Sequence, residues 1–160
     1  MTTEEGVFDN RRTPKTKGAP TMAINTKLSV AAHILSLVGM NPDERLTSEH
    51  IAGSVNTNPV VIRRIMGMLS RAGLVRTSPG VPGAVLARSL GEITLLDVYR
   101  AVQADEELFA IHDNPNPDCP VGRNIQGALD TAFSRAQRAM EAELGEVTME
   151  QVSMEIARGC

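Results

Sequence analysis

Residues 54–64 read SVNTNPVVIRR and combine residue types that can bind a nucleic acid. Consecutive amide and hydroxyl side chains end at Asn58, Pro59 follows, and Arg63 and Arg64 come about one helical turn later. Amide side chains pair with adenine edges in the major groove, and arginine pairs with O6 and N7 of guanine. Asn at the N-cap and Pro at the first helical position are also a typical helix start. The stretch therefore predicts a helix that presents hydrogen-bonding and cationic groups to duplex DNA.

The helix predicted to begin here has two unlike faces. It is expected to run to about residue 72 and to end at Gly73 in the left-handed conformation. One face suits burial in a core. It carries Ile62, Ile65, Met66 and Leu69. The opposite face is cationic, includes Gly67, and has no acid to pair with its arginines. This face is the one we expect to meet a polyanion.

The elements around this helix predict a winged helix-turn-helix. Apolar residues recur with helical period from 27 to 38, and a short helix is expected to begin at Thr47. Residues 74–77 and 84–87 follow the 58–72 helix and indicate two short strands. The turn-forming run SPGVPG between them is not expected to continue either strand. This order of elements predicts a mainly α fold with a small β-hairpin wing.

The candidate DNA-binding set combines the helix start, the basic face and the wing. It comprises Asn56, Thr57, Asn58, Pro59, Val60, Arg63, Arg64, Arg71, Arg76 and Arg88. The alternative is a winged helix that binds protein and leaves its arginines solvated. Residues 22–91 carry seven Lys/Arg and three acids, whereas residues 92–160 carry five Arg and thirteen acids. This asymmetry favours DNA as the partner of the first half.

A long amphipathic helix is predicted from 120 to 144. Its apolar residues recur every three or four positions, and Gly145 is expected to break it. About 24 residues at ~1.5 Å each give a rod of roughly 36 Å, longer than a small domain needs. Such a helix usually packs against a copy of itself or against the domain of a neighbouring subunit. Further helices are expected after Thr94 and Thr148, with one helical turn near 108–111.

The chain divides into four predicted parts. They are a disordered N-terminal extension (1–23), the winged helix-turn-helix (24–91), a helix and linker (92–119), and the dimerisation and C-terminal helices (120–160). No P-loop, dinucleotide fingerprint or nucleophile elbow occurs, so an enzyme is not expected. The longest weakly polar run is too short to span a membrane. Two widely separated cysteines favour a reduced, cytoplasmic setting.

The run IAGSVNTNPVVIRRIMGMLSRAGLVRTSPGVPGAVLAR, followed by EITLLDVYRAV, resembles the Rrf-two family of bacterial winged-helix repressors, the group of IscR, NsrR and CymR. SVNTNPVV and the later NPNPDCPVG are most similar to its YwnA-like branch. The resemblance covers about residues 27–156. It implies a homodimer whose 120–144 helix packs against its partner, and a palindromic operator. The family's wing often carries Arg-Gly and Gly-Gly-Tyr, whereas this wing lacks that arginine and that tyrosine.

Cys119 lies in DCPVGRN, just before the long helix. It resembles the last of three cysteines that iron–sulfur members of the family place in this linker. Residues 105–118 contain no cysteine, and a cluster needs about four ligands, so neither a cluster nor another metal is expected. Two interpretations of Cys119 stay open. A helix N-terminus lowers the pKa of a cysteine and suits a thiol sensor, whereas a thiol beside Asp118 could serve only to cap or pack the linker.

Overall fold

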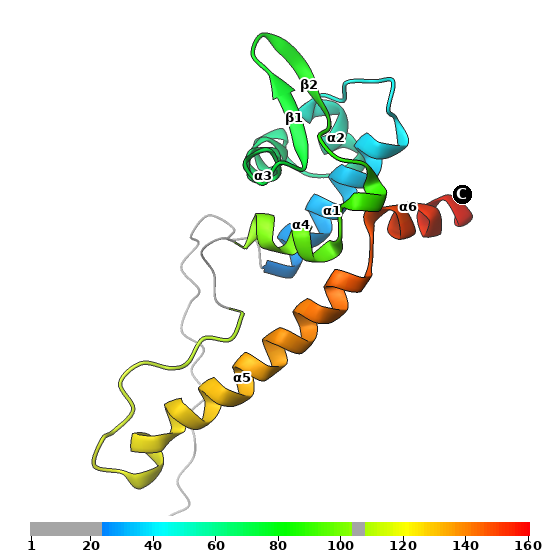
Figure 1. Ribbon diagram of the computed structural model, residues 1–160. Coiled ribbons are helices and arrows are strands. Elements are labelled where there is room, and N and C mark those ends of the chain that lie inside the picture. Colours follow the sequence, from blue (N-terminus) through cyan, green and yellow to red (C-terminus); the bar gives the residue numbers. More distant parts are fainter. Residues whose placement is uncertain (1–23, 104–107) are drawn as a thin grey trace, which may run out of the picture.

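The computed structural model describes residues 24–103 and 108–160, so the predicted extension at 1–23 lies outside the described residues. The elements are α1 (Ile24–Met40), α2 (Ser48–Val55), α3 (Pro59–Arg71), β1 (Val75–Ser78), β2 (Val81–Leu86), η1 (Leu90–Glu92), α4 (Leu95–Val102), α5 (Pro120–Glu146) and α6 (Met149–Arg158). The predicted fold class is confirmed: the chain is mainly helical, and its two-stranded hairpin stands beside α3 (Figure 1).

Local capping signals set the ends of the helix-turn-helix, as the sequence predicts. Thr47 caps α2 by accepting a hydrogen bond from the His50 N–H. Asn56 ends α2 in the left-handed conformation with φ of 59°. Asn58 then caps α3 by accepting from the Val60 N–H at 2.8 Å, with Pro59 at the first helical position. These caps orient the chain so that α3 begins immediately after a tight turn.

The predicted apolar face of α3 lies in the core. Ile62 and Leu69 are fully buried and Ile65 is 2% exposed, in one cluster with Ile34 of α1 and Val98 of α4. At about 25 cal/mol for each Å² of apolar surface removed from water, such a face holds a helix far more strongly than its intrinsic propensity does. The opposite face of α3 is therefore the one left toward solvent.

The wing differs from the prediction in its register. We expected SPGVPG to interrupt both strands, but only Pro79 and Gly80 form the turn, and β2 begins at Val81. A bulge between Thr77 and Ser78 leaves Pro82 and Gly83 opposite no residue of β1. The missing N–H of Pro82 therefore breaks no ladder hydrogen bond.

The loop before α2 adds a third segment to the wing. Leu46 forms a bridge with Ala84, and the Ala84 N–H donates to the Leu46 carbonyl at 3.2 Å. The Arg45 guanidinium donates to the carbonyls of Pro82 and Gly83. These contacts hold the part of β2 near the turn against the loop before α2, and the sequence pattern did not indicate them.

The C-terminal helices are joined to the winged helix by a short antiparallel bridge. The Leu95 N–H donates to Val147 and the Met149 N–H donates to Ile93, both at 2.8 Å. Thr94 and Thr148 pair there, and each caps its own helix through a capping box. The caps were predicted, but the bridge was not.

Two expectations about the linker and the long helix were wrong. Residues 108–111 form a bend without a helical turn. Gly145 does not break α5, which continues to Glu146 before the bridge takes over. A glycine inside a helix costs only about 1 kcal/mol relative to alanine. Gly145 faces α4, since a Cβ built on it would lie 3.5 Å from the Leu96 side chain.

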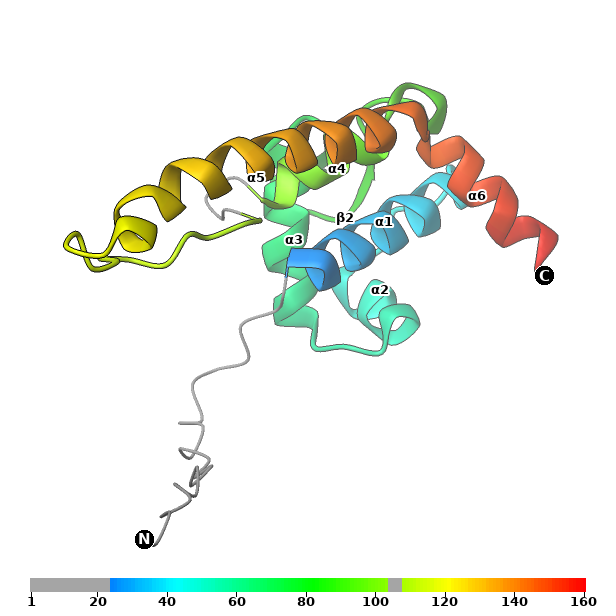
Figure 2. The same ribbon diagram turned by 90° about the horizontal axis from the view of Figure 1, so that it is seen from below.

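The long helix α5 projects away from the rest of the molecule (Figures 1 and 2). Near its C-terminal end it packs on α4, where the Arg100 guanidinium and the Glu141 carboxylate lie 3.0 Å apart. Near its middle, Phe133 stacks on Phe109 of the linker with ring centroids 5.0 Å apart. Over the described residues, no helix is both long and apolar enough to cross a membrane.

Replacing Gly83 should loosen the wing. Gly83 has φ of +86°, and a Cβ there would lie 2.6 Å from the Arg45 carbonyl oxygen. We expect Gly83→Ala to lower the free energy of unfolding by about 2–3 kcal/mol, combining backbone strain with a steric clash. Gly80→Ala is the matched control, since Gly80 also has positive φ but open space around it. Equal losses for both variants in urea unfolding would contradict the bracing role of Arg45.

Candidate nucleic-acid interface

The outer face of α3 presents the predicted residues to solvent. Val60 is 62% exposed, and Arg63, Arg64 and Arg71 are all exposed. Asn56 is also exposed, in the turn before the helix. This face continues directly from the helix N-terminus, where unpaired backbone N–H groups favour an anion.

Two of the predicted residues are partly committed to the fold. The side-chain oxygen of Asn58 accepts the capping hydrogen bond, so only its amide –NH₂ group can reach a partner. Pro59 is half-buried and serves the helix start. Their local role was predicted, and their contribution to a nucleic-acid contact is correspondingly smaller than that of their exposed neighbours.

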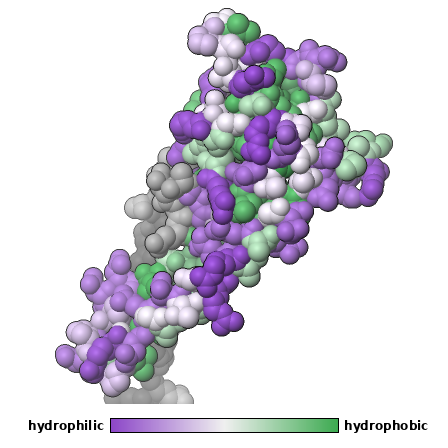
Figure 3. Space-filling model, in the orientation of Figure 1, coloured by the Kyte–Doolittle hydropathy of each residue, from purple (hydrophilic) through white to green (hydrophobic). Residues whose placement is uncertain are grey.

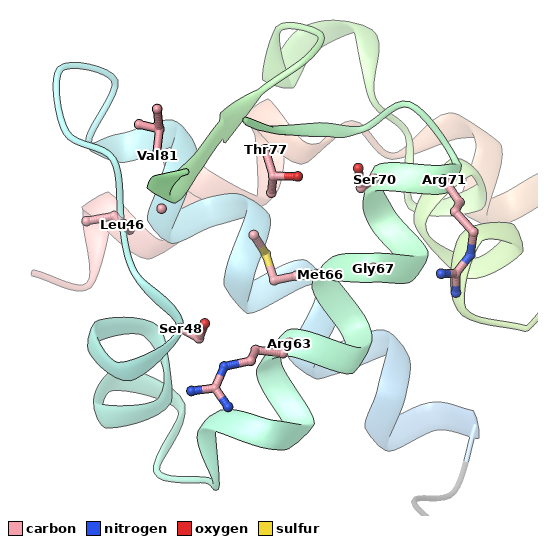
Figure 4. A pocket seen from close by; sticks show the side chains of 10 residues that line it. Leu46, Ser48, Arg63, Met66, Gly67, Ser70, Arg71, Thr77 and Val81 are labelled. Carbon is pink, nitrogen blue, oxygen red and sulfur yellow. The ribbon is translucent and has the colours of Figure 1, made fainter. Parts of the chain in front are cut away.

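A groove of about 450 Å³ runs between α3, the start of α2 and the wing (Figure 4). Its lining includes Ser48, Arg63, Gly67, Thr77 and Val81. Gly67 has no side chain to fill the groove, and a Cβ there would touch only the Arg71 guanidinium, at 3.4 Å. Figure 4 shows Arg63 beside Ser48 and Arg71 at the other end of α3. The groove is therefore open at its floor and cationic at both ends.

Arg63 is paired, contrary to the expectation that the basic face has no acid. The helix itself carries none, but Glu49 in the first turn of α2 places its Oε1 atom 2.5 Å from Nη2 of Arg63. The backbone N–H of Glu49 and the Arg63 guanidinium hold the pKa of the Glu49 carboxyl below its usual range. The two residues are fourteen positions apart, so a wheel drawn for one helix cannot show this pair.

Arg64 lies on the other flank of α3. It lines a second pocket of about 430 Å³ together with Asn56 and Thr57 of the turn and Lys27 of α1. The structure thus brings three of the predicted residues together around the N-terminal end of the recognition helix. Within the described part of the chain, Arg64, Arg71 and Arg76 have no carboxylate partner.

The two arginines predicted to flank the wing have different environments. Arg76 is exposed on β1. Arg88 lies beyond β2, donates to the Glu92 carbonyl and comes within 3.7 Å of the Asp97 carboxylate. Arg88 therefore contributes to the connection between the wing and α4. Arg45, which braces the wing and was missed, has no local signal because its partners are 37 and 38 residues away.

Cys119 occupies the N-cap position of α5 and is exposed. The backbone N–H groups of Gly122 and Val121 lower the pKa of its thiol. Gly122 lies so close to the Asn116 carbonyl that a Cβ would collide with it. The linker therefore closes tightly over the start of α5 and places the thiol at a helix N-terminus, where a thiolate is stabilised.

The described residues do not fit an iron–sulfur cluster. A cluster needs about four ligands, usually thiolates, and the sequence has only Cys119 and Cys160. Cys119 precedes α5 and Cys160 follows α6, and the start of α5 lies far from the C-terminus in Figures 1 and 2. Among the described residues, no three His, Cys, Asp or Glu side chains gather in a group that could hold a metal.

Comparisons with known proteins agree with this architecture. A protein 56% identical over 129 residues, covering 81% of this chain and 96% of its own length, is the proposed HTH-type transcriptional regulator YwnA of Bacillus subtilis (strain 168). A crystal structure of a proposed DNA-binding protein is 48% identical, with a TM-score of 0.65, and covers 79% of this chain and 97% of its own.

A more distant structure shares the fold. CymR, the global cysteine regulator of B. subtilis, is 20% identical with a TM-score of 0.61, over 84% of this chain and 98% of its own. The family described as Rrf2, iron-dependent transcriptional regulator, matches residues 24–155. The family and the relative from B. subtilis that is 56% identical are described as transcriptional regulators and not as enzymes. The resemblance noted in the sequence is thereby confirmed, and the chain belongs to the Rrf2 family of winged-helix, DNA-binding transcriptional regulators.

Proposed function

We propose that this regulator is a repressor that binds a palindromic operator as a homodimer. The observation that carries the proposal is the exposed basic face of α3, which begins at a helix N-terminus and borders an open groove under the wing. Inserted into the major groove, this face puts Arg63 and Arg64 near base edges and phosphates. Arg71 extends the same cationic surface along the groove, and Asn56 and Thr57 supply hydrogen bonds at the start of α3. Arg76 lies on the other face of the wing, in a pocket that also includes Glu44, so its contact with DNA would be separate from this surface. A regulator that acts on DNA in this way works in the cytoplasm.

The second copy is expected on α5. None of the residues of this 27-residue helix is buried, and Val121 is 68% exposed. Ala128, Ala132 and Ala136 follow Val121 along one side and are exposed as well. In Figure 3 the part of the molecule that α5 forms shows hydrophobic, neutral and hydrophilic residues next to one another. A two-fold pairing of α5 helices buries this stripe and presents two recognition helices to two half-sites.

Repression then follows from steric exclusion. Two winged helices held by one dimer occupy successive major-groove faces of the duplex. A promoter overlapped by such a site is closed to the transcription machinery. The alternative, a winged helix that binds only protein, predicts no enrichment of any DNA sequence and no salt dependence.

Selection of duplexes from a random pool separates these alternatives. The chain is expected to enrich an inverted repeat whose half-sites lie about one helical turn, 10–10.5 base pairs, or a multiple of it, apart. Binding should weaken steeply between 50 and 200 mM salt because phosphate contacts release counterions. An unenriched pool and salt-independent binding would contradict the proposal.

Removing either outward arginine of α3 should weaken DNA binding. We expect Arg63→Ala and Arg64→Ala each to lower affinity for a selected duplex by about five- to a hundredfold at low salt, in line with roughly 1–3 kcal/mol for one base or phosphate contact. Fluorescence anisotropy measures the change. Arg138→Ala, an exposed arginine on α5, is the control and should leave affinity unchanged. If all three variants weaken binding equally, the loss of affinity comes from the change in net charge and not from contacts made by α3.

A charge on the exposed stripe of α5 should dissociate the homodimer. Ala132→Glu places a carboxylate in the stripe, and its desolvation opposes pairing. Ser134→Glu is the matched control, because residue 134 is about 200° away from residue 132 around the helix. Sedimentation analysis is expected to give a monomer for the first variant and a dimer for the second. If both variants sediment as dimers, the second copy binds a surface other than this stripe of α5.

Cys119 is proposed to make the regulator responsive to oxidants. Its thiolate can attack a hydroperoxide, break the O–O bond and become a sulfenic acid while an alcohol or water leaves. The sulfur lies at the junction of the linker and α5, so oxidation adds a polar atom at this junction. The support is the exposed position of the thiol and the helix N–H groups that stabilise its charged form.

The lowered pKa of Cys119 should be visible in its reaction with iodoacetamide. Because the thiolate is the nucleophile, the folded protein should reach half its maximal rate at lower pH than the same chain in urea. The measurement uses the Cys160→Ser variant, in which Cys119 is the one remaining thiol of the sequence. Folding is then favoured above the unfolded pKa of the thiol, and this contribution is lost as pH falls through the folded pKa. Coincident pH profiles in the folded and unfolded chain would contradict stabilisation of the thiolate by the N–H groups at the start of α5.

A further inference from the structure

Arg63 differs from the other arginines on the outer face of α3 because it has a carboxylate partner. Glu49 reaches it from the first turn of α2, with Nη2 and Oε1 2.5 Å apart. Arg64 and Arg71 have no such partner among the described residues. An acid at the edge of a surface that binds phosphates opposes sequence-independent affinity. The position of Glu49 beside Arg63 therefore indicates a role other than raising the affinity for DNA.

The pair contributes little to folding. The side chains of Arg63 and Glu49 are 56% and 63% exposed, and ion pairs this exposed add little stability. The helix start that Glu49 occupies is already capped by Thr47. The ion pair is therefore not explained by the needs of the fold.

The geometry of the pair leaves most of the guanidinium available. Glu49 is hydrogen-bonded to Nη2 alone, and within the described residues no acceptor is bonded to Nε or Nη1 of Arg63. A guanidinium has five N–H donors, so it can keep one bond to a carboxylate and still make the bidentate contact to O6 and N7 of guanine. A phosphate on the same guanidinium would instead meet the carboxylate as a second anion.

We propose that Glu49 is a specificity-determining residue of the DNA site: by holding Arg63 through Nη2, it directs the remaining donors to a guanine edge and excludes a phosphate. This inference rests on the proposed DNA-binding function and deepens it. Glu49 acts through Arg63 as a positioning residue. Arg64, without an acid beside it, remains the arginine that binds phosphate irrespective of sequence.

The test compares Glu49→Gln with the full-length wild type on two probes, the duplex enriched by the wild type and a random duplex of equal length. The variant is expected to bind the random duplex about three- to tenfold more tightly at low salt, since Arg63 then neutralises one further phosphate and the salt slope steepens by roughly 0.9. Affinity for the enriched duplex should rise less, so the ratio of the two affinities falls. An unchanged ratio and slope would overturn the inference.

Two controls assign the effect to the Arg63 pair. Glu44→Gln removes an equal charge from the exposed turn before α2, where no arginine is bonded to it, and should leave the ratio unchanged. In an Arg63→Ala background, Glu49→Gln should no longer lower the ratio, whereas in an Arg64→Ala background it still should. If Glu49→Gln still lowers the ratio of the affinities for the enriched and random duplexes when Arg63 is alanine, the inference is overturned.

The same measurements distinguish this inference from the function on which it rests. A wild type that enriches no sequence and binds without salt dependence overturns both. If the wild type and Glu49→Gln distinguish the enriched duplex from the random duplex equally well, only the role of Glu49 is overturned. The thermal transition of Glu49→Gln should stay close to that of the wild type, which excludes unfolding as the cause of any change.

Discussion

The burial of one face of α3 is the constraint on which the rest of the structure depends. Ile62, Ile65 and Leu69 are almost without solvent contact and pack against α1 and α4. A helix held along a full apolar stripe cannot rotate about its axis without exposing that stripe to water. Buried residues that make no contact with DNA therefore decide that Arg63 and Arg64 face outward. The position of the basic face is set by packing in the core.

The sequence predicted the features that are encoded within a few residues. Asn58 and Pro59 start a helix wherever they stand, and the capping boxes at Thr94 and Thr148 need only a partner three positions away. The wing register, the Arg45 brace, the bridge between Thr94 and Thr148 and the Glu49–Arg63 pair escaped prediction. Each joins residues separated by 14 to 54 positions, or depends on a bulge. No local propensity contains that information, because it exists only once the core has formed.

The family description names iron, yet this chain lacks the donors for a cluster. Cys119 lies at the start of the long helix, where the backbone N–H groups of Gly122 and Val121 lower the pKa of its thiol. The electrostatic feature that would stabilise a bound thiolate also stabilises a free one. A position suited to holding a metal ligand can therefore be suited to thiol chemistry without change in the surrounding backbone.

The bridge between Thr94 and Thr148 fixes one end of α5, so α5 can tilt about that end. Two hydrogen bonds of 2.8 Å and the Arg100–Glu141 ion pair anchor its C-terminal end to α4, while its N-terminal end carries the linker and Cys119. A helix of this length is roughly 40 Å long, so a tilt of about 10° at the anchored end moves the free end by about 7 Å. Read in the other direction, a displacement of several ångströms at the free end turns the anchored winged helix by only a few degrees.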